Sequence, residues 1–104
     1  MRRIAFKLQL KPGCLAEYAR QHDALWPEMA ALIRATGVSD FRIWHDPETD
    51  ALFCSQLRAD DVAADAIRGH PVWQSWQAAM ADLLETAPDG TARRWPLNEV
   101  FHLP

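Results

Sequence analysis

The amino-acid sequence predicts a single α+β domain with the element order β-α-β-β-α-β. Three observations support this prediction: an alternating apolar pattern near the N-terminus, a helical pattern after it, and two further strand patterns separated by turn formers. The chain has 104 residues, a common domain size, and 49% of them are apolar, which is enough for a packed core. We therefore expect residues 1–104 to form one domain.

The first half of the chain changes from a strand period to a helix period. A strand is predicted at residues 4–10, where apolar residues occupy every second position. From Leu15 to Thr36 the apolar residues recur at three- and four-residue steps, and Gly37 follows in the usual position just past a helix end. Pro27 lies inside this pattern and removes one backbone donor. We therefore expect it to kink the helix or to start a second helical segment.

The second half repeats strands and a helix. The run of turn formers at 45–50 predicts an antiparallel hairpin, and Pro71 is a residue suited to the first turn of a helix. The elements expected here are strands at Val38–Trp44 and Ala51–Leu57, a short helix capped by Asp60 or Asp61 and ending at Gly69, a helix from Pro71 to about Leu84, a loop at 87–96 and a strand at Asn98–Leu103.

This order is that of the ferredoxin-like fold, a four-stranded antiparallel sheet with helices on one face. Apolar side chains are expected on both faces of the sheet, with Phe6 and Leu8 on one side and Trp44 and Phe53 on the other. The chain's own helices can cover one face. We therefore expect a homodimer in which the uncovered faces of two sheets meet.

Composition and motifs exclude several classes of protein. A net charge of −3 leaves no basic footprint for nucleic acid. Residues 1–10 have neither a signal-peptide core nor a membrane span, and Cys14 and Cys54 show no metal-like spacing or disulfide framework. We therefore expect a cytoplasmic protein without a membrane partner. Phosphate-binding loops, paired-histidine metal motifs and serine-nucleophile elbows are missing from the sequence, which predicts neither a metal nor a cofactor.

Tyr18 and His22 are four residues apart and therefore neighbours on one helix face. His22 interrupts an otherwise apolar stripe. It is either a core histidine bonded to the backbone, or a residue in a pocket that can gain and lose a proton near neutral pH. The residues alone leave both interpretations open.

The five tryptophans suggest a pocket for a neutral polyhydroxylated ligand. Trp73 and Trp76 are three apart on one predicted helix, and Trp26 and Trp44 add further indole surface. Each could be a core residue. Together they also suit a sugar, whose apolar C–H faces stack on aromatic rings and whose hydroxyls bond to indole N–H groups.

Two segments resemble signatures of a known family. The segment from Glu17 to Glu28, EYARQHDALWPE, resembles the first-helix signature of the L-rhamnose mutarotases, Tyr-x-x-x-His-x-x-x-Trp-Pro-Glu. The C-terminal EVFHLP, from Glu99 to Pro104, resembles their terminal signature. Lesser matches are Ala5–Phe6, Asp40–Trp44 and Trp76, so that the resemblance extends over the whole chain.

The resemblance implies a homodimeric α/β barrel with no cofactor, which interconverts the α and β anomers of L-rhamnose or a similar 6-deoxyhexose. It implies His22 as the catalytic proton donor and Tyr18 and Trp76 as substrate contacts. Phe41 stands where the family pattern has Tyr, and Gln77 where it has a second Trp. These two substrate-binding positions differ, so that another sugar such as L-fucose stays open.

Two other functions remain open from the residues. A cofactor-free monooxygenase-like enzyme on the same dimeric fold could use a pocket of Trp and His for an aromatic substrate. A non-catalytic domain that binds a small molecule would bind a sugar and leave anomer exchange unchanged. The motif between Tyr18 and Glu28 favours the mutarotase over both.

Overall fold

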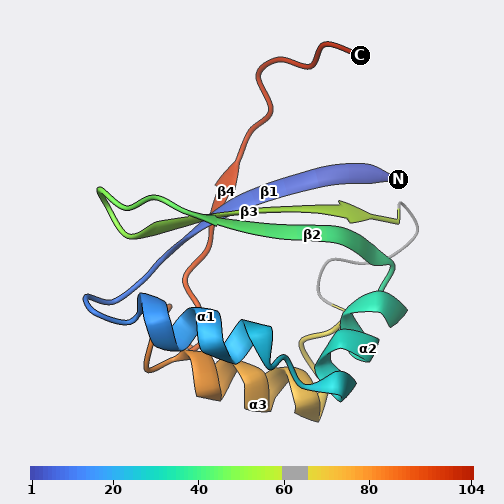
Figure 1. The fold of residues 1–104 in the computed structure, drawn as a ribbon. Coiled ribbons are helices and arrows are strands. Elements are labelled where there is room, and N and C mark those ends of the chain that lie inside the picture. The colour runs from blue at the N-terminus through green and yellow to red at the C-terminus, as the bar shows by residue number, and fades with distance from the viewer. Residues whose placement is uncertain (60–65) are drawn as a thin grey trace.

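A computed structural model of the chain describes residues 1–59 and 66–104 (Figure 1). Most helices and strands have bounds close to the predicted ones, and the exceptions are the end of α3 and the C-terminal strand. In chain order they are β1 (Arg2–Gln9), α1 (Leu15–Asp23), α2 (Pro27–Ala35), β2 (Val38–His45), β3 (Ala51–Arg58), α3 (Pro71–Met80) and β4 (Trp95–Leu97).

The four strands form one antiparallel sheet in the order β2-β3-β1-β4. Figure 1 shows α1, α2 and α3 on one side of this sheet, with α1 beside α3, and the C-terminal segment on the other side. The predicted α+β architecture, an antiparallel sheet with helices on one face, is confirmed. We call the side of the sheet opposite to α1, α2 and α3 the open face.

Pro27 starts a new helix, one of the two outcomes expected for it. α1 ends at Asp23, and Pro27 is the first residue of α2, where the missing backbone donor costs nothing because the first N–H groups of a helix have no partner within it. α2 then ends before Gly37, which has a positive φ of 80°. The break turns one long apolar stripe into two helices with different directions.

α3 is shorter than predicted, ending at Met80 instead of about Leu84. The backbone after it pairs with the end of β1: the Lys11 N–H donates to the Leu83 carbonyl, and the Glu85 N–H donates to the Gln9 carbonyl. These bonds occupy groups that a longer helix would need. Leu84 is buried at the resulting bridge to Leu10.

The strand predicted at Asn98–Leu103 is wrong. β4 is Trp95–Leu97, which pairs with residues 5–7 of β1, and the residues after it have no regular structure. A strand needs a neighbour with free backbone groups. The tail leaves the sheet (Figure 1) and pairs with no strand among the described residues. Pro96 is accommodated in β4 because the strand lies at an edge.

The short helix predicted from Asp60 or Asp61 to Gly69 begins outside the described residues, and residues 66–69 form turns. Within ranges 1–59 and 66–104, no helix is long and apolar enough to cross a membrane.

The core lies between the sheet and the helices. Leu52 and Cys54 of β3 are its least exposed side chains. Burial raises the pKa of the Cys54 thiol to about 12, so that it is a neutral packing group at cellular pH. Both cysteines are free thiols. The same period-2 alternation that turns these two residues inward also turns Gln56 and Arg58 toward the helices.

Candidate functional site

A cavity of about 630 Å³ lies between the sheet and the helices. Its volume falls within the range of small-molecule sites, roughly 300–1,000 Å³. All five residues predicted for the site line this one cavity: Tyr18, His22, Phe41, Trp76 and Gln77. They come from α1, β2 and α3, and the fold brings them together from three parts of the sequence.

His22 is held in one orientation by its own helix. Its Nδ1 lies 2.9 Å from the carbonyl oxygen of Tyr18, one turn earlier. A carbonyl can accept but not donate a hydrogen bond, so Nδ1 carries the proton when the imidazole is neutral. The other nitrogen, Nε2, is then the basic atom. The backbone bond expected of a core histidine is thus present, but on a histidine that lines a cavity.

Burial lowers the pKa of His22 below its ordinary value of 6.5, while the bond to Tyr18 and the charge of Asp23 oppose the effect. The neutral imidazole is therefore the main form at cellular pH. Burial also raises the pKa of the Tyr18 phenol, which stays protonated and can donate or accept a hydrogen bond. The site thus offers one basic nitrogen beside one neutral hydroxyl.

Aromatic rings surround His22 on two sides. The Tyr18 ring lies 4.1 Å from the imidazole between centroids, and the Trp76 ring meets it edge-on at 5.3 Å. Trp26 in turn packs edge-on against Trp76 at 5.1 Å. Trp76 is 6% exposed, so its position is determined by packing on both sides. Trp26 packs against Trp76 but is not among the residues that line the cavity.

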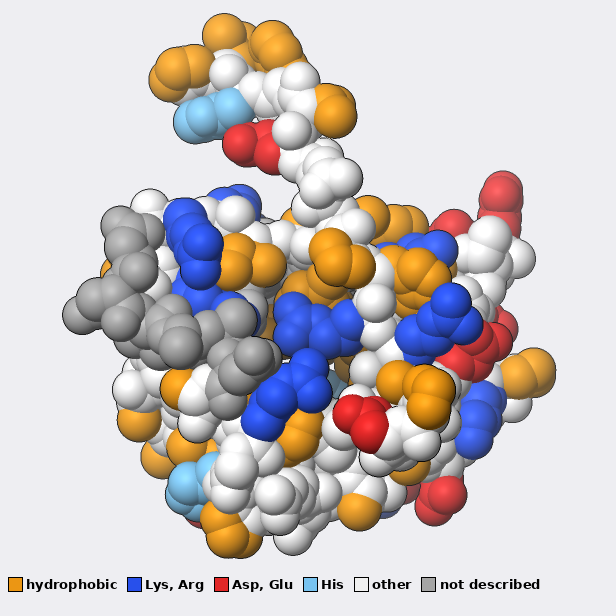
Figure 2. Space-filling view, turned by 180° about the vertical axis from the view of Figure 1, so that it is seen from behind, with side chains coloured by type: hydrophobic (Ala, Val, Ile, Leu, Met, Phe, Trp, Pro, Cys, Tyr) orange, Lys and Arg blue, Asp and Glu red, His pale blue; other side chains and the backbone are white. Residues whose placement is uncertain are grey.

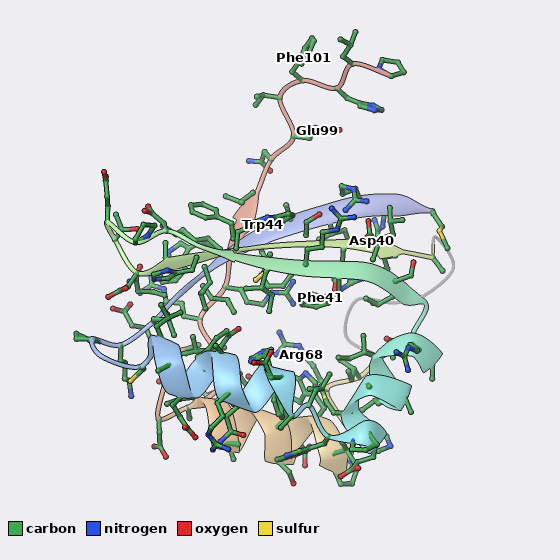
Figure 3. All side chains as sticks on the ribbon, in the orientation of Figure 1. Asp40, Phe41, Trp44, Arg68, Glu99 and Phe101 are labelled. Atoms are coloured by element: carbon green, nitrogen blue, oxygen red, sulfur yellow. The ribbon has the colours of Figure 1, made fainter. Side chains whose placement is uncertain are left out.

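The other two tryptophans considered for the pocket have separate positions. Trp73 lines the cavity from α3. Trp44 does not: it pairs with Phe53 across β2 and β3 on the open face and is 51% exposed. Figure 3 shows Trp44 on the side of the sheet away from the helices. The interpretation of Trp44 as part of the sugar pocket is therefore wrong, whereas its predicted place on the second face is confirmed.

Gln77 has a structural partner as well as a place in the cavity. Its Oε1 accepts a hydrogen bond of 3.0 Å from the backbone N–H of Ala92, in the loop that follows α3. Ala92 and Thr91 also line the cavity. The amide oxygen is thus engaged in holding this loop, and the Nε2 amide is what Gln77 can offer a ligand.

Phe41 forms part of the cavity wall on the sheet side. Its ring meets Phe6 of β1 edge-on, with 6.4 Å between centroids, and the Arg94 guanidinium lies 3.8 Å from the centre of the Phe6 ring. Phe41 is 41% exposed. Much of its ring therefore remains available to a ligand.

Sequence reasoning missed the arginines of the cavity wall. Arg34, Arg58, Arg68 and Arg94 all line it. Figure 2 shows Lys and Arg side chains gathered at the centre of one face of the molecule, and Figure 3 shows Arg68 in the space between sheet and helices. Arg58 could have been found from the pattern, because it follows the inward-facing Leu52 and Cys54 at even spacing along β3.

Among residues 1–59 and 66–104, no group of three or more His, Cys, Asp or Glu side chains is placed to hold a metal ion. The chemistry that the described residues offer is proton transfer by an imidazole in an aromatic-lined pocket.

Comparisons with known proteins agree with these features. A sequence model of the L-rhamnose mutarotases matches residues 3–103. An L-rhamnose mutarotase of Jannaschia sp. (strain CCS1) is 50% identical over 104 residues, 100% of both chains, and one of Verminephrobacter eiseniae (strain EF01-2) is 46% identical over 101 residues, 97% of this chain and 95% of the other.

A solved structure is also similar. The crystal structure of an L-rhamnose mutarotase from Formosa agariphila superposes with a TM-score of 0.90 at 35% identity, covering 100% of both chains. The match of the family over nearly the whole chain, together with relatives at this identity, is decisive: the chain belongs to the L-rhamnose mutarotase family.

Proposed function

We propose that the protein is an L-rhamnose mutarotase, an isomerase that interconverts the α and β anomers of L-rhamnose. The observation that carries this proposal is the His22 imidazole in a cavity of sugar size, bonded through Nδ1 to Tyr18 and flanked by the Trp76 ring. Membership in the L-rhamnose mutarotase family supports the same reaction.

The reaction moves one proton between two oxygens of the sugar. Mutarotation breaks the bond from C1 to the ring oxygen O5, lets C1 turn, and closes the ring on the other face. In our proposal neutral His22 removes the O1 proton through Nε2 and then, as an imidazolium, donates it to O5 as the C1–O5 bond breaks and the C1 carbonyl forms. Both oxygens are attached to C1, so one nitrogen can reach both. Ring closure reverses these steps.

The other wall residues bind and orient the sugar. The protonated Tyr18 hydroxyl is proposed as a hydrogen-bonding contact, and Trp76 and Phe41 as flat surfaces for the C–H faces of the ring. Gln77 is proposed to contribute its Nε2 amide. The deoxy position of L-rhamnose suits the apolar part of this wall.

Exchange NMR between the anomers of L-rhamnose tests the reaction. We expect the wild-type protein to accelerate exchange over buffer, and His22→Ala to lose about 10²- to 10⁴-fold of this acceleration, the usual contribution of a general acid or base. His70→Asn is a matched control, because His70 caps α3 through a bond from the Val72 N–H that asparagine can also accept. Wild-type acceleration by His22→Ala would refute the assignment of His22.

The protein is proposed to act as a homodimer through its open face. Trp44, Phe53 and Leu97 are exposed on or beside this face, at 51%, 37% and 41%. Beyond them the tail extends away from the body, with Val100 95% and Phe101 77% exposed (Figure 3). Exposing such an apolar surface to water is unfavourable in free energy, and a second copy of the chain would cover it.

The molar mass from light scattering, measured on the protein as it elutes from a size-exclusion column, tests the dimer. We expect twice the chain mass of 11.8 kDa for the wild type. Trp44→Glu should give the single mass, because it places a charge in the centre of the proposed interface. Leu15→Glu is a control on the helix side, where Leu15 is also exposed. A wild-type protein with the single mass would contradict the dimer.

We also propose that the protein is located in the cytoplasm. Its two free thiols support this location.

A further inference from the structure

The pairing of β2 with β3 is irregular beside the cavity. Ser39 pairs with Leu57 and Arg42 with Ser55, so that Asp40 and Phe41 together face the single residue between Leu57 and Ser55. This two-against-one arrangement is a β-bulge. Asp40 has a positive φ of 47°, in the left-handed region that non-glycine residues adopt infrequently and Asp more readily than most.

The bulge decides which side of the sheet Phe41 faces. Val38 is buried toward the helices, and strict alternation from it would put Phe41 on the open face. The extra residue shifts the alternation by one, so that Phe41 lines the cavity. Figure 3 shows Phe41 on the helix side of β2 and Asp40 on the other side. Aspartate and phenylalanine thus exchange the places that an unbroken strand would give them.

Asp40 is among the residues that line the cavity, but its carboxylate is held on the open face by two arginines. Its carboxylate accepts a hydrogen bond of 2.9 Å from Nη2 of Arg3 and another of 3.0 Å from Nε of Arg42. Arg3 also donates to the Ser55 hydroxyl. Because β3 lies between β1 and β2, Arg3 spans β3 and links β1 to β2 at the bulge. Both arginines hold the pKa of Asp40 below its ordinary value, so that it stays charged at cellular pH.

The Phe41 side chain is only partly buried. Its packing partner is Phe6, which it meets edge-on at 6.4 Å, and 41% of its surface is exposed. A ring so loosely packed can move when its backbone moves. The local backbone at Asp40 therefore helps to determine where the Phe41 ring lies in the cavity.

We propose that Asp40 is a positioning residue for sugar binding, which acts through Phe41. The Arg3–Asp40–Arg42 contact on the open face maintains the bulge, and the bulge holds the Phe41 ring against the bound sugar. This inference rests on the proposed mutarotase function, because it takes the cavity as the sugar site. Asp40 itself lines the cavity, whereas its partners Arg3 and Arg42 do not. The inference therefore extends the site to two arginines on the opposite face of the sheet.

Asp40→Asn removes the negative charge of the side chain and allows the same backbone conformation. Asparagine has the same shape and tolerates a positive φ, but it offers a neutral amide to the two arginines. With anomer exchange of L-rhamnose measured over a range of sugar concentrations, we expect KM to rise about fivefold and kcat to change less than twofold. Arg42→Gln should raise KM in the same direction, and it provides a second measurement should Asp40→Asn fail to fold.

The matched control is Glu17→Gln. Glu17 also makes an exposed ion pair, with Arg20 on α1, and it does not line the cavity. Its loss should leave KM and kcat unchanged. A purely structural role of Asp40 would instead lower the unfolding temperature with KM unchanged, and that result would overturn the proposal.

A double variant tests whether Asp40 acts through Phe41. If it does, Asp40→Asn should raise KM no further in a Phe41→Ala background than Phe41→Ala does alone. Additive effects would refute the proposal, because they would mean that Asp40 acts on binding by another route, such as its own contact with the sugar or the dimer contact. Failure of the proposed function would look different: the wild-type protein would not accelerate anomer exchange at all.

Discussion

The Nδ1 of His22 lies 2.9 Å from the carbonyl oxygen of Tyr18, one helical turn before it. This bond assigns the proton of the neutral imidazole to Nδ1 and leaves Nε2 as the basic atom. Burial then favours the neutral form. The helix that carries the histidine thus determines both its orientation and its resting protonation state.

The pH dependence of the rate follows from this state. If neutral His22 starts the reaction, kcat/KM should be level above the ordinary pKa of 6.5 and fall below it, with a midpoint under 6.5 because burial lowers the pKa. Below the midpoint the fall should approach about tenfold for each pH unit. Exchange NMR between pH 5 and 8, corrected for the buffer rate, measures the profile. A rate that rises as the pH falls would contradict a neutral resting histidine.

The free energy of unfolding should depend on pH through the same residue. Because the pKa of His22 is lower in the folded than in the unfolded protein, the unfolded protein binds more protons between the two values. The contribution of neutral His22 to the free energy of unfolding is therefore fully present above pH 6.5, and it is lost as the pH falls through the folded pKa. Urea unfolding at pH 7.5 and 5.0 should show a larger loss for the wild type than for His22→Gln, in which this group cannot titrate. Equal losses would show that burial of His22 carries no penalty.

Trp76 should contribute to both stability and binding. Trp76→Ala removes a side chain that is 6% exposed and should lower the free energy of unfolding by about 3–5 kcal/mol. Trp76→Phe keeps an aromatic face and should mainly raise KM. Trp26→Phe is the control, because Trp26 packs on Trp76 without lining the cavity. A normal KM for Trp76→Phe would argue that the indole does not contact the sugar.

Two substitutions at Gln77 distinguish the role of its amide oxygen from the role of its amide nitrogen. Gln77→Ala leaves the Ala92 N–H without its acceptor and should cost about 0.5–1.5 kcal/mol of stability. Gln77→Glu keeps an acceptor for Ala92 but loses the amide donor, so it should preserve stability and raise KM. Urea unfolding and exchange kinetics give the two readouts. A normal KM for Gln77→Glu would assign Gln77 a structural role alone.

Phe41→Tyr tests the missing hydroxyl at this position. A tyrosine hydroxyl that reaches the sugar would add one hydrogen bond, worth about 0.5–1.5 kcal/mol, and should lower KM about 2- to 12-fold. Phe41→Leu is the control for the ring itself and should raise KM. Exchange measurements with L-rhamnose and L-fucose in parallel show whether the hydroxyl also changes the sugar preference. An unchanged KM for Phe41→Tyr would place the para position of the ring away from the sugar.

Local sequence patterns accounted for most of the fold. Alternation identified β1, because side chains of a strand point to opposite faces whatever the strand's neighbours are. The turn formers at residues 45–50 identified β2 and β3 as a hairpin. Pro27 marked the break between α1 and α2 because the loss of a backbone donor is a property of the residue itself. The motif around Tyr18 and His22 could be found for the same reason: residues four apart share a helix face in any fold.

What the tertiary structure decided depends on partners distant in sequence. β4 lies at Trp95–Leu97 instead of in the tail because β1 offers a pairing edge at residues 5–7. The bulge at Asp40 reverses the face of Phe41, and no local pattern marks it, since its stabilising partner Arg3 is 37 residues away. His22 was identifiable from the sequence as a candidate for proton transfer. Its place in a cavity, with Trp76 beside it, required the packing of α1 and α3 under one sheet.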